Sequence, residues 1–425
     1  MLRKLGIFEK AILIGNQHAP FNIVSVVQMK NAPSPETLLD GVNMLRSRHP
    51  LLRAQVTKEG SRIYFEERKS SNFHFEVQEK TSEDQWQKFA EREMDHSFNL
   101  DEEALFRVTY LYTQGSGDLV LTLHHGITDA VGGMNLFNEL LQICAGEKEN
   151  LAPLEVIPPP EERFPAQYQG IRRFFSVGRY AVLEMSEMFS YLFRARNKRQ
   201  PPVRLGGSGK IITLQLPEEL VDQLSRAGRK RGITLNSLLN AAQVLAVNRH
   251  LYHGAALPMR TFAFANLRPY TIPPTPNWDL GSFVAMLVYT LDVHKDEDIW
   301  DLAKKLQHKI YRTLKSGDKF NALLMSENLL RFFTSSKSMR FATTALNYSN
   351  LVPLKSNYGE IEVLSLHGFV SGYDLGPELA SQARLFKDKI WWDFIYLNTD
   401  MNEQTASSII EEITQILEQA VRQEH

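Results

Sequence analysis

The sequence has few cysteines, little net charge and no long apolar run, and each shortage excludes a class of protein. Cys144 is the single cysteine among 425 residues, which excludes an intrachain disulfide and a cysteine-based zinc site. Cysteine poverty is typical of a reducing compartment, so we expect a cytoplasmic protein. Lysine and arginine number 48, against 49 aspartates and glutamates. This balance produces no bulk positive field and argues against nucleic acid as a partner.

The uncharged stretches are too short to cross a membrane. The longest of them, such as Leu280–Leu291 and Phe341–Leu354, fall below the roughly 20 apolar residues that a spanning helix needs. Residues Met1–Asn16 begin with two basic residues, but Glu9 and Lys10 interrupt any apolar core of a signal peptide. We therefore expect a soluble protein. Its hydrophobic fraction of 43% is enough to build a sizeable core.

The pattern of helix and strand signals divides the chain into two parts. Five prolines between residues 151 and 169 mark a connector. On both sides of it, helical and strand-like stretches are mixed, which favours an α+β protein over a simple alternating sheet. We expect two lobes, residues 1–165 and 206–425, joined by a basic helical connector at 166–205. Local signals predict helices over 35–49, 82–94, 134–144, 171–199, 217–230, 235–247, 298–314 and 403–421, and strands over 51–56, 105–112, 119–123, 211–216, 282–291 and 390–397.

The helix predicted in the connector has an unusual charge. Residues 171–199 hold seven arginines and lysines against two glutamates. Such an excess is typical of a helix that contacts a membrane surface or an anionic partner. The interpretation that we favour is a solvated helix that crosses the boundary between the lobes.

The segment Leu119–Ala130 holds the strongest candidate for chemistry. An apolar strand delivers His124 and His125 to its end, and a short turn then delivers Asp129. Side chains alternate along a strand, so His125 shares a face with Leu123 if the strand continues that far, and His124 points the other way. A neutral imidazole suits a general base, which Asp129 would orient. The spacing alone favours a simpler alternative, two structural histidines at a strand end, and it offers no third metal ligand.

A resemblance to a known family changes this weighting. The run His124-His125-x-x-x-Asp129-Ala130 resembles the HHxxxDG motif of the condensation-domain and alcohol acyltransferase superfamily, which has the chloramphenicol acetyltransferase-like fold. That superfamily includes polyketide-associated acyltransferases and stand-alone condensation domains. The resemblance spans most of the chain and implies two lobes, each with a mixed sheet and helices, around an active-site tunnel. Further segments are similar to the family in the expected order: Leu45–Arg53, Asn266–Pro269, Leu280–Val284 and Phe386–Tyr396.

The resemblance also implies roles for individual residues. In the family, the second histidine of the motif acts as a base, or positions the acceptor, for attack on a thioester, and this role falls on His125. The family aspartate is structural and pairs with a downstream arginine. The resemblance therefore predicts an Asp129–Arg268 salt bridge that holds the loop, with His124 as further support for the site.

The tetrahedral oxyanion formed in such an attack needs hydrogen-bond donors. The candidates are backbone N–H groups near Gly126 and the side chains of Ser349 and Asn350, in a run that resembles alcohol acyltransferases. Two positions depart from the family pattern. Ala130 replaces the motif glycine, which restricts the backbone and is expected to shift the loop. Ala285 stands where condensation domains often have asparagine.

The resemblance implies an acyltransferase that moves an acyl group from a thioester to a hydroxyl or amine acceptor, with ester formation favoured. The donor would be acyl-CoA or the phosphopantetheine arm of an acyl carrier protein. We expect no permanently bound cofactor and no metal. Three alternatives stay open: an amide-forming condensation enzyme, a non-catalytic relative that binds a carrier protein or lipid in the same cleft, and a membrane-surface protein that uses the basic helix.

Overall fold

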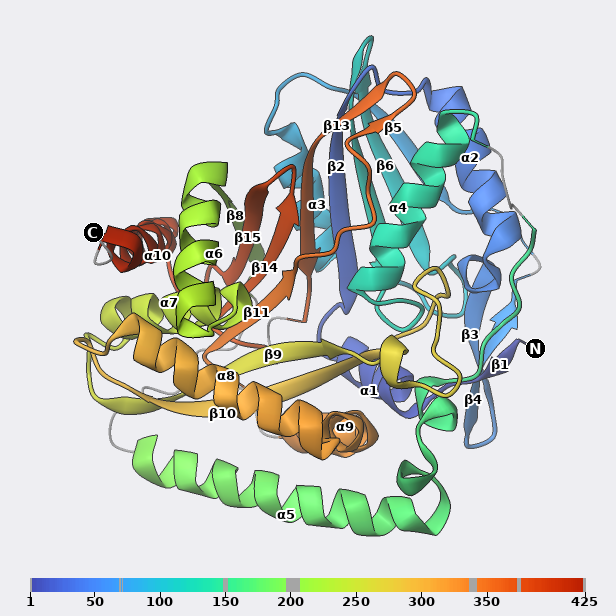
Figure 1. Cartoon of the computed structure of the whole chain (residues 1–425). Coiled ribbons are helices and arrows are strands. Elements are labelled where there is room, and N and C mark those ends of the chain that lie inside the picture. The colour runs from blue at the N-terminus through green and yellow to red at the C-terminus, as the bar shows by residue number, and fades with distance from the viewer. Residues whose placement is uncertain are drawn as a thin grey trace.

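The computed structural model contains two lobes, each built on a six-stranded sheet (Figure 1). It describes residues 2–68, 70, 72–147, 152–195, 207–335, 342–372 and 376–422. The predicted α+β class with two lobes is confirmed. No helix within these ranges is both long enough and apolar enough to cross a membrane.

The sheet of the N-terminal lobe has helices on both faces. Helices α2 (Pro35–Arg48) and α4 (Ala130–Cys144) pack on one face, and α3 (Gln85–Asp95) packs on the other. A small sheet of β1 (Arg3–Lys4), β4 (Arg62–Glu67) and β3 (Ala54–Glu59) lies beside it. In spatial order, the strands of the six-stranded sheet are β12 (Asn357–Tyr358), β13 (Ile361–Val370), β2 (Asn22–Lys30), β7 (Ser116–His124), β6 (Phe106–Thr113) and β5 (His74–Glu79).

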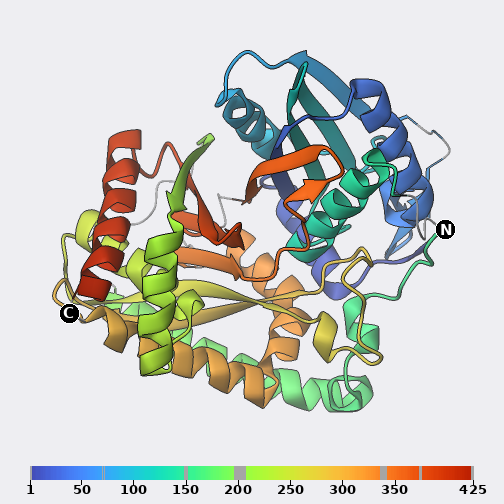
Figure 2. The same cartoon turned by 45° about the horizontal axis from the view of Figure 1, so that its top comes forward.

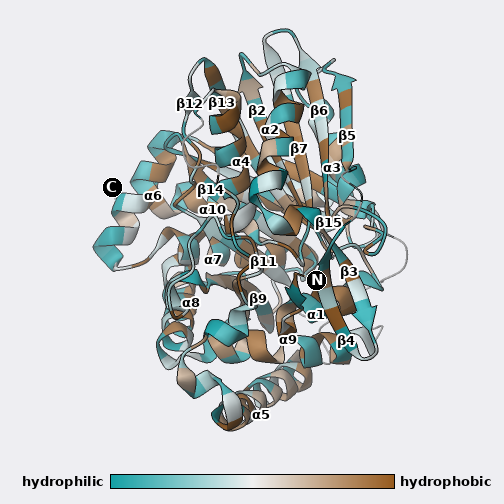
Figure 3. Ribbon diagram, turned by 90° about the vertical axis from the view of Figure 1, so that its right-hand side faces the viewer, coloured by the Kyte–Doolittle hydropathy of each residue, from teal (hydrophilic) through white to brown (hydrophobic). Residues whose placement is uncertain are grey.

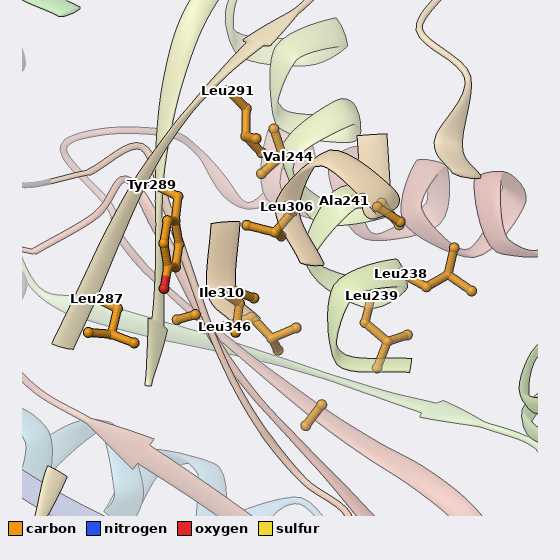
Figure 4. Packing of buried hydrophobic residues seen from close by; sticks show 14 of the residues in the cluster. Leu238, Leu239, Ala241, Val244, Leu287, Tyr289, Leu291, Leu306, Ile310 and Leu346 are labelled. Carbon is orange, nitrogen blue, oxygen red and sulfur yellow. The ribbon is translucent and has the colours of Figure 1, made fainter. Parts of the chain in front are cut away.

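The sheet of the C-terminal lobe buries its outer face under α6 (Glu218–Arg231), α7 (Leu235–Leu251), α8 (Ile299–Ser316) and α10 (Glu403–Arg422). Helix α7 is buried on nearly all sides, and its leucines and alanines contact side chains of α8 and the sheet (Figure 4). The strands are, in spatial order, β10 (Val284–Val293), β9 (Leu257–Asn266), β11 (Thr344–Ser349), β14 (Leu379–Phe386), β15 (Lys389–Leu397) and β8 (Gly209–Leu216).

Three helices complete the end of the molecule below this sheet in Figure 1. Helix α1 (Ile7–Asn16) packs against α9 (Asp318–Ser335), although α1 begins the N-terminal lobe. Helix α5 (Gly170–Ala195) lies along α9 and β9 as the outermost layer. The predicted connector helix is thus present. The last residues of that prediction, 196–199, and the rest of the predicted connector, 200–205, lie outside the described residues.

The lobes do not follow the order of the chain, and the predicted boundaries fail for residues 357–370. Strand β13 falls within the range assigned to the C-terminal lobe, yet it pairs antiparallel with β2, with Glu362 opposite Lys30 and Val370 opposite Ile23. Figure 2 shows this crossing from one lobe to the other. Local sequence signals do not report pairing between strands so far apart in the chain, so the exchange was not predictable from periodicity.

Most predicted elements are present, and their caps explain where they begin. The Ser34 hydroxyl accepts a hydrogen bond from the N–H of Thr37 at the start of α2, and Thr234 caps α7 in the same way. Two strands begin more than one residue later than predicted: Pro50–Arg53 form a 3₁₀ turn, so that β3 starts at Ala54, and β10 starts at Val284 instead of residue 282.

Candidate active site

Residues 124–130 form a tight connection between β7 and α4. Strand β7 ends at His124, and Asp129 caps α4 by accepting a hydrogen bond from the N–H of Gly132 at 3.0 Å. Strand alternation therefore does not extend to His125, which leaves the sheet and lines a cavity between the lobes. The cavity is also lined by Ile23, which lies opposite Leu123 on β2.

The imidazole of His125 is held in one tautomer. Its Nδ1 atom lies 3.0 Å from the carbonyl oxygen of Thr128. A carbonyl only accepts hydrogen bonds, so Nδ1 carries the proton and Nε2 keeps its lone pair. Burial lowers the pKa of His125 below its ordinary value. The side chain is therefore a neutral base at neutral pH, and Phe8 packs edge-on against its ring with the ring centres 5.8 Å apart.

The hydroxyl of Ser282 holds the same turn. Ser282 donates a hydrogen bond to the carbonyl oxygen of Thr128 at 3.1 Å and contacts the carbonyl of His125. Ser282 is buried and comes from the loop before β10, so the C-terminal lobe positions a turn of the N-terminal lobe. Sequence reasoning did not select Ser282, although it lies inside the family-like segment Leu280–Val284.

His124 has a structural environment. Its Nδ1 accepts the backbone N–H of Gly126 at 3.1 Å, and its side chain is fully buried, with Phe98 edge-on at 5.9 Å between ring centres. Burial, together with the charge of Arg107, lowers the pKa of His124 to about 3. His124 is thus neutral at any ordinary pH and braces the turn.

The predicted Asp129–Arg268 salt bridge is present and buried. The Oδ2 atom of Asp129 lies 2.6 Å from Nη1 of Arg268, and the backbone N–H of Phe283 donates to the same oxygen at 2.8 Å. Arg268 also donates to the carbonyls of Asp279 and Gly281. Both carboxylate oxygens of Asp129 accept hydrogen bonds, whereas the buried Nε of Arg268 has no partner, and the pair joins the two lobes.

Ala130 does not disturb this arrangement. It is the first residue of α4, where the backbone is helical and alanine fits without strain. Asp129 keeps both its cap and its arginine. Position 130 has no left-handed backbone, so this turn does not require glycine there.

The cavity that His125 lines has a volume of about 180 Å³ and walls from both lobes. Helix α1 and β2 contribute one side, and β9, β10, α9 and β14 contribute the other. The walls are mostly apolar. Among the polar side chains that line them are Asn347, Ser381 and Gln382. Such a chamber suits an apolar group that must be placed against a few polar atoms.

The three oxyanion candidates chosen from the sequence lie elsewhere or are already bonded. The N–H of Gly126 donates to His124. The hydroxyl of Ser349 donates to the carbonyl of Leu351 at 3.3 Å, outside the cavity wall. Asn350 is exposed and borders a separate hollow near the start of α7. Ser349 and Asn350 therefore lie beyond the chamber, and the residue of this segment that lines the chamber is Asn347.

Asn347 lies two positions before Ser349 on β11, opposite Gln382 of β14. Its side-chain nitrogen donates to the Oε1 atom of Gln382 at 3.2 Å. An amide nitrogen carries two hydrogens, so a second one is available to a ligand. The alternation of strand β11 could have indicated this residue, because positions 347 and 349 share a face.

The fold and this site define a two-lobed protein of the chloramphenicol acetyltransferase-like class, with a histidine in a chamber between the lobes. The model of the condensation domain family matches residues 12–425. The chain belongs to that family.

Individual relatives agree with this assignment. The phthiocerol/phthiodiolone dimycocerosyl transferase of Mycobacterium leprae (strain TN) is 24% identical over 212 residues, which are 48% of this chain and 49% of that protein. The chain thus spans about half the length of this curated relative. Among solved structures, polyketide synthase associated protein 5 of Mycobacterium tuberculosis superposes with a TM-score of 0.69 at 16% identity, covering 98% of both chains.

A fungal enzyme has the same fold. The trichothecene 15-O-acetyltransferase of Fusarium sporotrichioides gives a TM-score of 0.75 at 14% identity, covering 99% of this chain and 95% of that one. The first condensation domain of the calcium-dependent antibiotic synthetase gives 0.74 at 13% identity, covering 99% and 96%. At these identities the structural likeness establishes the fold.

Proposed function

We propose that the protein is an acyltransferase that moves an acyl group from a thioester to a hydroxyl acceptor, with His125 as general base. The observation that carries the proposal is the fixed tautomer of His125 in a mostly apolar chamber. Thr128 binds the protonated nitrogen, so the basic nitrogen is the one left for an acceptor. Burial keeps it unprotonated at neutral pH.

The reaction needs only one proton carrier. The acceptor oxygen attacks the thioester carbonyl while its proton passes to Nε2 of His125, and a tetrahedral oxyanion forms. The oxyanion collapses, the carbon–sulfur bond breaks, and the proton returns from His125 to the departing thiolate. The second N–H of Asn347 is our candidate for the oxyanion donor, in place of Gly126, Ser349 and Asn350.

The lining of the chamber indicates the substrate class. Phe262, Phe264 and Met286 face the cavity from the C-terminal lobe, and these side chains bind an acyl chain better than a charged amino-acid residue. The dimycocerosyl transferase and the 15-O-acetyltransferase are named for acyl transfer, which supports the same reaction here. We infer a free or carrier-bound acyl thioester as donor, and ester formation over amide formation.

Mass spectrometry of the products tests this function. Acyl-CoA and acyl carrier protein donors of increasing chain length would be incubated with pooled alcohols and amines. We expect an ester product from the wild type and its loss in His125→Ala, by a factor of about 10²–10⁴. Undiminished turnover by His125→Ala would remove the base assignment, and acylation of amines alone would replace ester formation with amide formation.

A further inference from the structure

Helix α5 turns an apolar face away from the protein. Globular helices usually bury the apolar face and expose the polar one, and α5 does the opposite along most of its 26 residues. The brown segments of α5 stand at the foot of the molecule in Figure 3. The α5 apolar face, as we call it, consists of six side chains with exposed fractions from 52% at Met185 to 77% at Phe175: Ile171, Phe174, Phe175, Val182, Met185 and Phe189.

The opposite face of α5 attaches the helix to the C-terminal lobe. Tyr180 and Tyr191 are buried, and Ser176 donates a hydrogen bond to Asn321 of α9 at 2.8 Å. Arg179 forms an ion pair with Asp318. Because these contacts fix the rotation of the helix about its axis, the α5 apolar face points toward solvent. The solvated helix expected from the sequence is present, but much of its exposed surface is apolar and its main contacts are with α9 and β9.

Helix α5 also carries more positive than negative charge. The described helix holds four arginines against two glutamates, and two of those arginines form ion pairs with aspartates outside the helix. The whole chain has a net charge of −1, so the excess is local. Arg172 is exposed at the start of α5. Arginine can extend its charged end to lipid phosphates while its stem stays among apolar chains.

We propose that α5 is an interfacial helix that docks the protein on an anionic phospholipid surface. Aromatic and aliphatic side chains on one face, with arginines along its border, are the composition of helices that lie in the membrane interface. The helix is about 39 Å long, and it runs along the edge of the molecule (Figure 1). A second copy of the chain fits less well, because pairing two such faces brings their arginine borders together.

Flotation with vesicles tests the proposal on the full chain. Vesicles of phosphatidylcholine alone are compared with vesicles that also contain phosphatidylglycerol, at low and high salt. We expect binding to the anionic vesicles that weakens as salt increases, because screening reduces the electrostatic part. Phe175→Gln/Phe189→Gln should lower the vesicle-bound fraction at least about tenfold, and Arg172→Gln should lower it about fivefold.

The matched control removes exposed apolar side chains elsewhere. Val77 and Leu351 are 42% and 83% exposed and lie outside α5, so Val77→Gln/Leu351→Gln should bind vesicles as the wild type does. Circular dichroism and a melting curve show that each variant is folded. The proposal is overturned if the wild type stays unbound, or if the phenylalanine variant floats equally well. It is also overturned if sedimentation equilibrium finds a dimer that this variant dissociates, because the face would then bind a second copy.

Discussion

The Nδ1 atom of His125 lies 3.0 Å from the carbonyl oxygen of Thr128, within the same turn. This contact sets the tautomer before any substrate arrives, because the carbonyl requires a proton on Nδ1. Preorganisation of this kind leaves Nε2 as the only basic atom of the ring. The pH response of the reaction therefore reports directly on one nitrogen.

The first prediction concerns that pH response. Burial lowers the pKa of His125, so the neutral, active form should persist below the pH at which a free histidine becomes charged, about 6.5. We expect kcat/KM to be level near neutral pH and to fall tenfold per pH unit only below this value. A pH–rate profile with acyl-CoA checks this. An acidic limb centred at or above about 6.5 would contradict a buried histidine base.

The second prediction concerns Ser282, which we regard as a positioning residue. Its hydroxyl bonds the carbonyl that holds Nδ1 of His125, so Ser282→Ala should lower kcat about tenfold or more, since small displacements of a base are costly. KM should change little, because Ser282 is not among the residues that line the cavity. Ser282→Thr keeps the hydroxyl and should recover much of the rate. Equal losses in the two variants would indicate a packing defect alone.

The third prediction separates Asn347 from Ser349 as oxyanion donor. Asn347 lines the chamber, whereas the Ser349 hydroxyl is bonded to Leu351 outside it. Removing one oxyanion donor typically lowers kcat about 10²–10³-fold, so we expect such a loss in Asn347→Ala. Ser349→Ala, the matched control on the same strand face, should stay within about twofold of the wild type. Steady-state kinetics of both variants provide the comparison, and the reverse pattern would restore Ser349 as the donor.

These positions show which parts of the site were predictable. The Asp129–Arg268 pair was predicted from the family resemblance, and the hairpin that carries His124 followed from strand periodicity and its glycine turn. The proposed oxyanion donor Asn347 was not, because it reaches the chamber through the parallel pairing of β11 with β14 inside the C-terminal sheet, and the opposite wall comes from the other lobe. The placement of β13 beside β2 was equally hidden. Local patterns specify which face of a strand is buried, but they do not report what lies opposite that face.

The fourth prediction concerns stability at the junction of the lobes. The side chains of Asp129 and Arg268 are 5% and 1% exposed, so Asp129→Asn leaves a buried guanidinium without its counter-charge. Breaking a buried pair in this way typically costs about 3–5 kcal/mol of the free energy of unfolding. Urea denaturation with an unchanged m-value would measure the loss.

An exposed pair provides the matched control for that measurement. Arg53 and Glu67 lie 2.8 Å apart with side chains 29% and 53% exposed, and Glu67→Gln should cost less than about 1 kcal/mol, because water screens the pair. In Asp129→Asn/Arg268→Met the orphaned charge is removed together with its partner, so part of the lost stability should return. A variant Asp129→Asn that is as stable as Glu67→Gln but inactive would show that Asp129 acts in the chemistry. The lobe junction would then depend on the remaining contacts of Arg268 with the carbonyls of Asp279 and Gly281.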